Sequence, residues 1–251
     1  MKYLIAGIRL FALLIIIMIS IIIVIIFYPV TPQKYWMYVI KYWAKIMLFF
    51  VGVKIETIGK FPENYLQKNC MIIANHISWL DIPVLYSLYF VSFVSRAEVK
   101  NWPILNLLFK CSGTIFIDRS RKKDILTINK IASKRLMDNL AIGFFPEGKT
   151  SDGKGVLPFK APLLQAGIIA KSRILPLALK YYSKSTVKPA YEITYAGDIT
   201  LWQTIKSTLL LNGICVKIIA LPQFNATDFV NRREMARELY KEISTVYNRG
   251  Y

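Results

Sequence analysis

Residues 71–81 read MIIANHISWLD, an apolar run that gives way to polar side chains. This pattern predicts a buried strand that ends at the carboxyl edge of an α/β sheet, where such proteins place their active sites. His76 is the only histidine in the chain, so any histidine-based catalysis must use it. A turn from His76 to Asp81 would bring the carboxylate to the imidazole and leave the other ring nitrogen as a general base.

The same spacing also fits a purely structural role. A buried histidine beside a helix-capping aspartate would produce this pattern, and Pro83 is tolerated in the first turn of such a helix. Ser78 is a possible nucleophile, but it does not lie in a G-x-S-x-G elbow. On spacing alone, the catalytic and the structural interpretations both stay open.

From residue 53 onward, short apolar runs alternate with segments of helical period. The expected strands are 53–58, 71–74, 91–95, 114–117, 141–145, 175–179, 191–194 and 216–221. The expected helices include 123–140 and 227–246, each with apolar residues on one face. This alternation predicts a single α/β domain over residues 53–251, with a mixed sheet flanked by helices.

Residues 1–52 have the pattern of a membrane anchor. Residues 10–30 carry no charged side chain, and about 20 residues are enough for a helix to cross the hydrocarbon core. Pro29 and Pro32 would end this helix. The segment that follows, FYPVTP, does not resemble a signal-peptide cleavage site, so we expect a retained transmembrane helix. Residues 35–53 are rich in aromatics and carry Lys41 and Lys45, which predicts an interfacial helix or a second span.

The charge and the composition of the chain exclude some classes of function. Lys plus Arg number 33 against 15 Asp plus Glu, a net charge of +18, and 55% of residues are hydrophobic. A basic, apolar chain is not disordered, and it is expected to meet an anionic membrane lipid or anionic substrates. The chain has no RNA-recognition strand motif and no helix-turn-helix, so we expect no nucleic-acid partner.

The rare residues argue against a metal site. A single histidine cannot build a multi-histidine zinc site, and Cys70, Cys111 and Cys215 show no C-x-x-C spacing. Residues 143–150, GFFPEGKT, match the P-loop string, but bulky Phe residues and Pro146, which has no N–H, do not suit a phosphate cradle. We therefore expect neither a metal nor a bound nucleotide cofactor.

Four short blocks follow one another along the chain: NHISWLD (75–81), GTIFIDR (113–119), FPEG (145–148) and ILPLA (174–178). In sequence and in order they resemble the blocks of the glycerolipid acyltransferases, the family of 1-acyl-sn-glycerol-3-phosphate (lysophosphatidate) acyltransferases. The resemblance covers about residues 53–179, and four ordered blocks are far more specific than one.

The resemblance implies a membrane-bound enzyme of phospholipid biosynthesis. It would move a fatty acyl group from a thioester to the sn-2 hydroxyl of lysophosphatidate, giving phosphatidate. His76 would be the general base and Asp81 its orienting partner. Arg119 would contact the phosphate of the acceptor, and Glu147 and Gly148 would help to build the acceptor site. On the residues alone, Arg119 also fits an exposed basic run, and Glu147 fits a turn after Pro146.

One departure from the family pattern concerns the acceptor. The third block usually continues T-R-S, whereas this chain has Lys149, Thr150 and Ser151. Lys149 would restore the charge one position away, but an ammonium is a point charge and not a fork. The nearest alternative is an acyltransferase for another lysolipid such as lyso-ornithine lipid. A lower alternative is a non-catalytic lipid-binding protein.

The acyl donor implied by the resemblance is acyl-carrier protein, which is acidic, or acyl-CoA, which carries phosphates. A positive face would raise the on-rate for either donor. Both donors are cytosolic, which predicts a catalytic domain on the cytoplasmic side of the bacterial inner membrane. The reaction itself needs no metal and no redox cofactor.

Overall fold

A mixed sheet of eight strands forms the centre of the structure, a computed structural model that describes residues 1–61, 68–96, 111–117 and 122–249. The strands are β1 (Val53–Ile58), β2 (Cys70–Ala74), β3 (Ser92–Arg96), β4 (Ile115–Ile117), β5 (Ala141–Phe144), β6 (Arg173–Ser183), β7 (Ile214–Ala220) and β8 (Phe224–Asn225). Their order is β1-β7-β6-β2-β5-β3-β4, and β8 pairs with β6.

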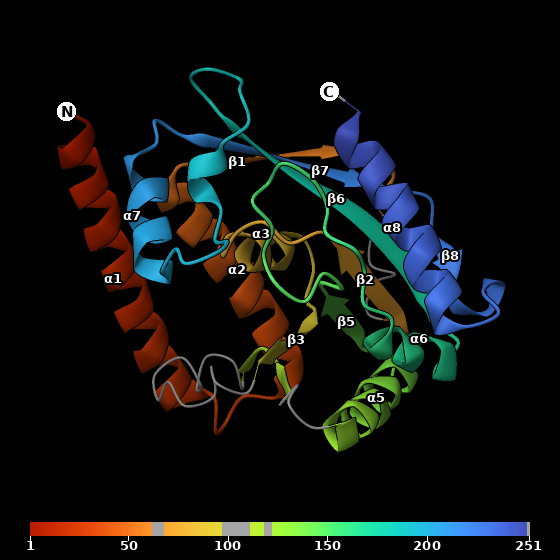
Figure 1. Cartoon of the computed structure of the whole chain (residues 1–251). Coiled ribbons are helices and arrows are strands. Elements are labelled where there is room, and N and C mark those ends of the chain that lie inside the picture. The colour runs from red at the N-terminus through yellow and green to blue at the C-terminus, as the bar shows by residue number, and fades with distance from the viewer. Residues whose placement is uncertain (62–67, 97–110, 118–121, 250–251) are drawn as a thin grey trace.

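Helices flank this sheet (Figure 1). The α-helices are α1 (Lys2–Phe27), α2 (Gln33–Val51), α3 (Asp81–Leu88), α5 (Lys122–Met137), α6 (Gln165–Ile169), α7 (Leu201–Leu210) and α8 (Arg232–Asn248). The short 3₁₀ helices among the described residues are η3 (Pro162–Leu164), η4 (Tyr191–Ile193) and η5 (Ala226–Asp228). Helix α8 packs along β6, α2 packs on α3, and α1 packs beside α7.

The topology places two loops at one edge of the sheet. Strand β2 runs parallel to both β5 and β6, with Ile73 opposite Phe144 and Pro176. Strand β7 is antiparallel to β6, so the sheet is mixed, as the sequence predicted. Because β2 and β5 are parallel neighbours, their carboxyl ends meet, and the loops after Ala74 and Phe144 leave the same edge.

The core lies around β2, β5 and β6. Every residue of β2 and β5 is buried, as is typical of strands covered on both faces. Gly143 of β5 allows a close approach, since a Cβ there would lie 2.5 Å from Cε1 of Phe93. The aromatic ring of Phe93 on β3 therefore packs directly against the backbone of β5.

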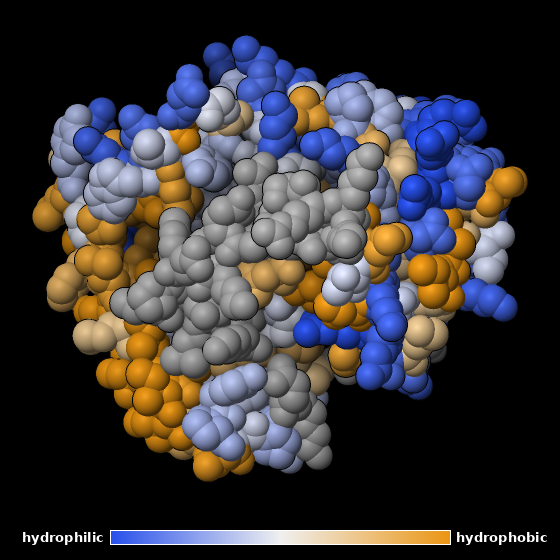
Figure 2. Space-filling model, turned by 60° about the horizontal axis from the view of Figure 1, so that its bottom comes forward, coloured by the Kyte–Doolittle hydropathy of each residue, from blue (hydrophilic) through white to orange (hydrophobic). Residues whose placement is uncertain are grey.

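Helix α1 is the one helix in the described residues that is long and apolar enough to cross a membrane. Its apolar side chains are largely exposed, and Figure 2 shows apolar surface gathered on the left side, where α1 lies in Figure 1. The helix ends at Phe27, shortly before Pro29, which agrees with the predicted stop. Arg9 ties it to the end of α7, because Nη1 donates to the carbonyls of Leu209 (3.2 Å) and Leu211 (2.6 Å).

Helix α2 shares its buried face with the α/β core. Trp36, Ala44 and Val51 are almost fully buried on this face, and the helix contacts α3 extensively. The opposite side exposes aromatic rings, including Tyr42 and Phe49. The aromatic helix that the sequence predicted is thus a packed element of the domain on one face and an apolar surface on the other.

Two of the predicted elements differ from the structure in type or in starting residue, and the helix expected over 123–140 is α5, which ends at Met137. Residues 191–194, expected as a strand, do not form one: Tyr191–Ile193 make η4, where the Thr194 N–H donates back to the Tyr191 carbonyl (3.1 Å) and the Ile193 carbonyl accepts from the Ser78 hydroxyl (2.8 Å). The C-terminal helix begins at Arg232 and not at residue 227, because the Asn231 side chain accepts from the N–H groups of Arg233 and Glu234 and so caps the helix there.

Candidate active site

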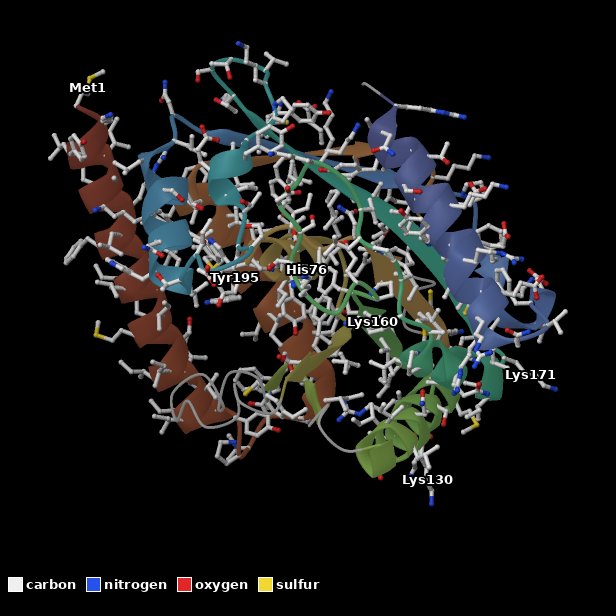
Figure 3. The ribbon with its side chains drawn as sticks, viewed as in Figure 1. Met1, His76, Lys130, Lys160, Lys171 and Tyr195 are labelled. Atoms are coloured by element: carbon white, nitrogen blue, oxygen red, sulfur yellow. The ribbon has the colours of Figure 1, made fainter. Side chains whose placement is uncertain are left out.

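His76 lies just beyond the carboxyl end of β2, at the position predicted from the sequence. Asn75, the residue before it, fixes the strand end: its side-chain amide donates to the Leu179 carbonyl (3.0 Å) and accepts from the Leu179 N–H (2.7 Å) on β6. The His76 side chain is 19% exposed, so one edge of the ring reaches the surface of the site. Figure 3 shows it near the middle of the molecule, between Tyr195 and Lys160 in that view.

Asp81 holds the imidazole of His76. Its Oδ2 lies 2.7 Å from Nδ1 of His76 and also accepts from the N–H groups of Ile77 (2.7 Å) and Ser78 (2.9 Å). The carboxylate is fully buried at the first position of α3, where the helix dipole favours a negative charge. Since an ionised carboxylate only accepts, Nδ1 carries the proton and Nε2 is left as the basic nitrogen.

A stack of rings fixes the plane of this imidazole. Phe145 lies parallel to His76, with ring centroids 4.1 Å apart and an interplanar angle of 13°. Phe93 in turn stacks on Phe145 at 5.5 Å and 1°. The ring of His76 is therefore restrained by a hydrogen bond at its edge and an aromatic face on one side.

Glu147 holds the backbone of the loop that carries His76. Its Oε1 accepts from the backbone N–H of His76 (2.6 Å), and its Oε2 accepts from the N–H of Leu157 (2.9 Å). The side chain is 2% exposed, and burial raises the pKa of its carboxyl to about 7. With both oxygens bonded to backbone, Glu147 joins the loop after β5 to the loop that carries His76.

The rest of the third block forms a turn beside the site. Gly148 takes the left-handed conformation, with φ of 76°, and its N–H donates to the Phe145 carbonyl (3.1 Å). Lys149 is exposed, whereas the hydroxyl of Thr150 donates to the carbonyl of Tyr195. Lys149 is thus the basic side chain that this turn presents to solvent. Arg119 lies outside the described residues.

Some groups at the site were not singled out from the sequence. The phenol of Tyr181 donates to Oδ1 of Asp81 (2.6 Å), although the two residues are 100 positions apart. Ser78, which the sequence offered as a possible nucleophile, is buried, and its hydroxyl donates to the carbonyl of Ile193 in η4 (2.8 Å). No local pattern marks Tyr181, since its role depends on β6 lying beside β2.

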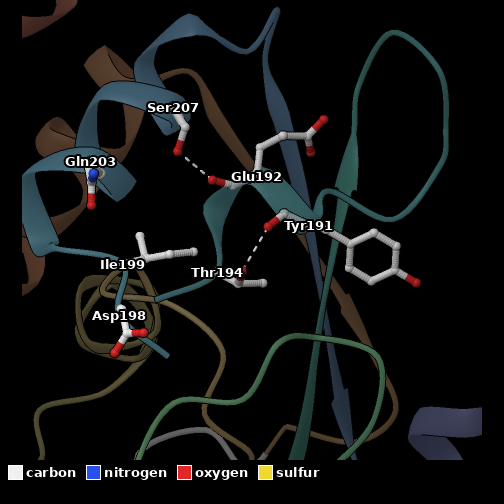
Figure 4. A pocket seen from close by; sticks show the side chains of 7 residues that line it. All are labelled: Tyr191, Glu192, Thr194, Asp198, Ile199, Gln203 and Ser207. Carbon is white, nitrogen blue, oxygen red and sulfur yellow. Dashed lines mark hydrogen bonds between the residues drawn. The ribbon is translucent and has the colours of Figure 1, made fainter. Parts of the chain in front are cut away.

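One cavity among the described residues lies away from the dyad. It measures about 550 Å³ and lies between η4 and α7, lined by Tyr191, Asp198 and Gln203 among others (Figure 4). A smaller cavity of about 280 Å³ is lined in part by Ile77 and Tyr181, both of which bond to Asp81. Within the described ranges, no three His, Cys, Asp or Glu side chains are placed to hold a metal ion.

A family model and the sequences of known relatives all match this chain to acyltransferases. The acyltransferase family model matches residues 52–180, a segment that contains all four sequence blocks. The chain is 38% identical over 179 residues to the 1-acyl-sn-glycerol-3-phosphate acyltransferase of Neisseria gonorrhoeae, and the match covers 69% of each chain. It is 29% identical over 220 residues to the lyso-ornithine lipid O-acyltransferase of Brucella abortus, which covers 80% of this chain and 79% of that relative.

The fold agrees with these sequence matches. The crystal structure of the 1-acyl-sn-glycerophosphate (LPA) acyltransferase PlsC from Thermotoga maritima is similar over 100% of this chain and 98% of that chain. The TM-score is 0.73 at 17% sequence identity, which shows a shared fold. On the family match and the N. gonorrhoeae relative together, this chain belongs to the acyltransferase family.

Proposed function

We propose that this acyltransferase moves a fatty acyl group from a thioester donor to the sn-2 hydroxyl of lysophosphatidate and so makes phosphatidate. The observation that carries the proposal is the 2.7 Å contact between Nδ1 of His76 and Oδ2 of Asp81, which leaves Nε2 as the basic nitrogen. The acceptor is chosen because relatives at 38% identity from two Neisseria species carry the name 1-acyl-sn-glycerol-3-phosphate acyltransferase.

The chemistry needs one base and no covalent enzyme intermediate. Nε2 of His76 takes the proton of the acceptor hydroxyl while the oxygen attacks the thioester carbonyl carbon. The tetrahedral intermediate collapses as the C–S bond breaks, and the imidazolium returns the proton to the leaving thiolate. Asp81 stabilises the imidazolium while it exists, as the carboxylate does in other histidine-based sites.

Recognition of the acceptor is assigned to basic groups near the site. Arg119 would bind the phosphate, because a guanidinium is planar, always charged and bidentate. Lys149 would add a second positive charge from the turn that also carries Gly148 and Thr150. Glu147 would act on the acceptor site through the backbone it holds, since both of its carboxylate oxygens are engaged.

We further propose a membrane-bound enzyme with its anchor in residues 1–52 and its α/β domain in residues 53–251. Helix α1 supports the anchor by its length and apolarity. The donor would be acyl-carrier protein or acyl-CoA, which puts the domain on the cytoplasmic face of the bacterial inner membrane. The direct transfer would use no resident metal or redox cofactor.

A second acceptor is favoured by one observation. Thr150 stands where the family usually has an arginine, and its hydroxyl is bonded to the backbone of Tyr195. Four relatives, from different bacteria and 28–32% identical, are named lyso-ornithine lipid O-acyltransferases. A lyso-ornithine lipid has no phosphate to recognise, so it is the competing substrate.

An acceptor panel tests the proposal. Purified protein and its His76→Ala variant would receive acyl-CoA or acyl-carrier-protein donors, with lysophosphatidate, other lysophospholipids and lyso-ornithine lipid as acceptors, and products would be read by mass spectrometry. We expect phosphatidate from the wild type and a rate about 10²–10⁴ lower from the variant. Product from lyso-ornithine lipid alone would change the assigned acceptor to that lipid and would leave the proposed role of His76 intact. No His76-dependent product from any acceptor would reject the enzyme assignment.

A further inference from the structure

The buried phenol of Tyr181 has no part in the proposed acyl transfer, yet it lies directly behind the dyad. Tyr181 is on β6 and 5% exposed, and its Oη donates to Oδ1 of Asp81 at 2.6 Å. The other carboxylate oxygen accepts from Nδ1 of His76 and from the N–H groups of Ile77 and Ser78. A phenol, a carboxylate and an imidazole therefore form one hydrogen-bonded chain.

The direction of the bond from Tyr181 is set by chemistry. The carboxylate can only accept, so the phenol donates. Burial raises the pKa of Tyr181 well above its ordinary value, and the neighbouring charge of Asp81 raises it further. The phenol therefore keeps its proton and serves as a fixed donor.

A donor on Oδ1 changes what Asp81 does to His76. It neutralises part of the carboxylate charge, which would otherwise act more fully on the imidazole and favour the protonated ring. It also fixes the rotation of the carboxylate, so that Oδ2 faces Nδ1. We infer that Tyr181 is a positioning residue that sets, through Asp81, how readily the His76 imidazole takes up a proton.

The inference deepens the proposed function and rests on His76 as the base. Other titratable groups face the same site within the described residues. Glu147 reaches it through the backbone N–H of His76, and Tyr247 of α8 lines the same cavity as Ile77 and Tyr181, where its phenol donates to the Gly153 carbonyl (2.5 Å). Neither of them bonds to the Asp81 carboxylate, which accepts its one phenol bond from Tyr181.

Kinetics of Tyr181→Phe give the first test. Removing the donor should move the acid limb of the profile of kcat/KM against pH upward by about one pH unit, which is about tenfold in rate on that limb. KM for both substrates should stay unchanged, because Tyr181 lies behind Asp81. The matched control is Tyr182→Phe, the same change on the next residue of β6, whose ring faces Lys217 Nζ at 5.0 Å.

A second readout does not need activity. Because His76 is the only histidine, ¹⁵N NMR of the full chain in detergent reports its imidazole without ambiguity. The pH at which that ring becomes charged should rise by about one unit in Tyr181→Phe and stay in place in Tyr182→Phe. If the wild type proves inactive and this shift is seen, the proposed function fails while the coupling stands.

An isosteric change covers the case in which Tyr181→Phe does not fold. Incorporating 3-fluorotyrosine at position 181 keeps the hydroxyl and makes it a stronger donor, so both the acid limb and the imidazole titration should move to lower pH. A rate loss that is equal at all pH values, with the imidazole titration unchanged in both variants, would overturn the inference and leave Tyr181 a packing residue.

Discussion

At Asp81 a single, fully buried carboxylate accepts from four donors. Oδ2 receives the imidazole and two backbone N–H groups, and Oδ1 receives the Tyr181 phenol. Hydrogen bonds to a charged group are worth about 1.5–3 kcal/mol each, whereas an unpaired buried charge is far more unfavourable. The four donors together compensate for the removal of Asp81 from water, and only one of them is the imidazole that we propose as the general base.

Glu147 is a buried carboxyl whose titration should be visible in stability. Its pKa is raised to about 7, so the folded protein holds this proton more tightly than the unfolded chain, which titrates near about 4.3. Its contribution to the free energy of unfolding is therefore fully present below about pH 4.3 and is lost as the pH rises to 7. Urea unfolding should show wild type losing up to about 3 kcal/mol over this window relative to Glu147→Gln.

The control for this experiment is Glu192→Gln, which changes an exposed carboxyl. Its curve should run parallel to that of the wild type. A Glu147→Gln curve that also runs parallel would mean that the buried carboxyl does not titrate between these pH values.

At the scale of elements, the contact between β3 and β5 orders the site. Gly143 allows Phe93 to lie against β5, and Phe93 stacks on Phe145, which stacks on His76. The orientation of the imidazole thus depends on the close packing of β3 against β5 as well as on the hydrogen bond to Asp81.

Gly143→Ala should disturb this stack. The new Cβ would lie 2.5 Å from Phe93, so the ring or the strand must move, and overpacking of this kind destabilises by about 1–3 kcal/mol. We expect a lower midpoint of thermal unfolding and a lower kcat. Gly155→Ala is the matched control, because a Cβ there meets nothing within 4 Å. Equal midpoints for the two variants would contradict the packing argument.

Across the whole molecule, an apolar helix and a basic charge would act on the same partner, the anionic membrane of the proposed function. Helix α1 exposes apolar side chains along its length while held to α7 through Arg9. The net charge of +18 adds attraction to anionic lipid, which depends on ionic strength, whereas burial of apolar side chains does not.

Vesicle flotation separates these two contributions. We expect binding to vesicles containing anionic lipid to weaken at least about fivefold between about 0.05 and about 0.5 M NaCl, and binding to zwitterionic vesicles to change little. Salt-independent binding to both kinds of vesicle would show that the basic charge does not contribute.

Local pattern was sufficient for much of this protein. Apolar runs predicted the inner strands and α1, because burial and hydropathy are properties of short segments. The His76–Asp81 pair was also predictable, because a strand end followed by a helix start brings residues five apart together. The family followed from four ordered blocks.

The remaining features came from contacts between distant segments. Tyr181 reaches Asp81, and Glu147 reaches the backbone of His76, because β6 and β5 lie on either side of β2. Residues 191–193 form η4 and not a strand, with the Ile193 carbonyl held by the distant Ser78 hydroxyl, and the Thr150 hydroxyl donates to the Tyr195 carbonyl. Strand order depends on the packing of the whole sheet and not on any local pattern, so the groups that surround the dyad became visible only when the strands were placed side by side.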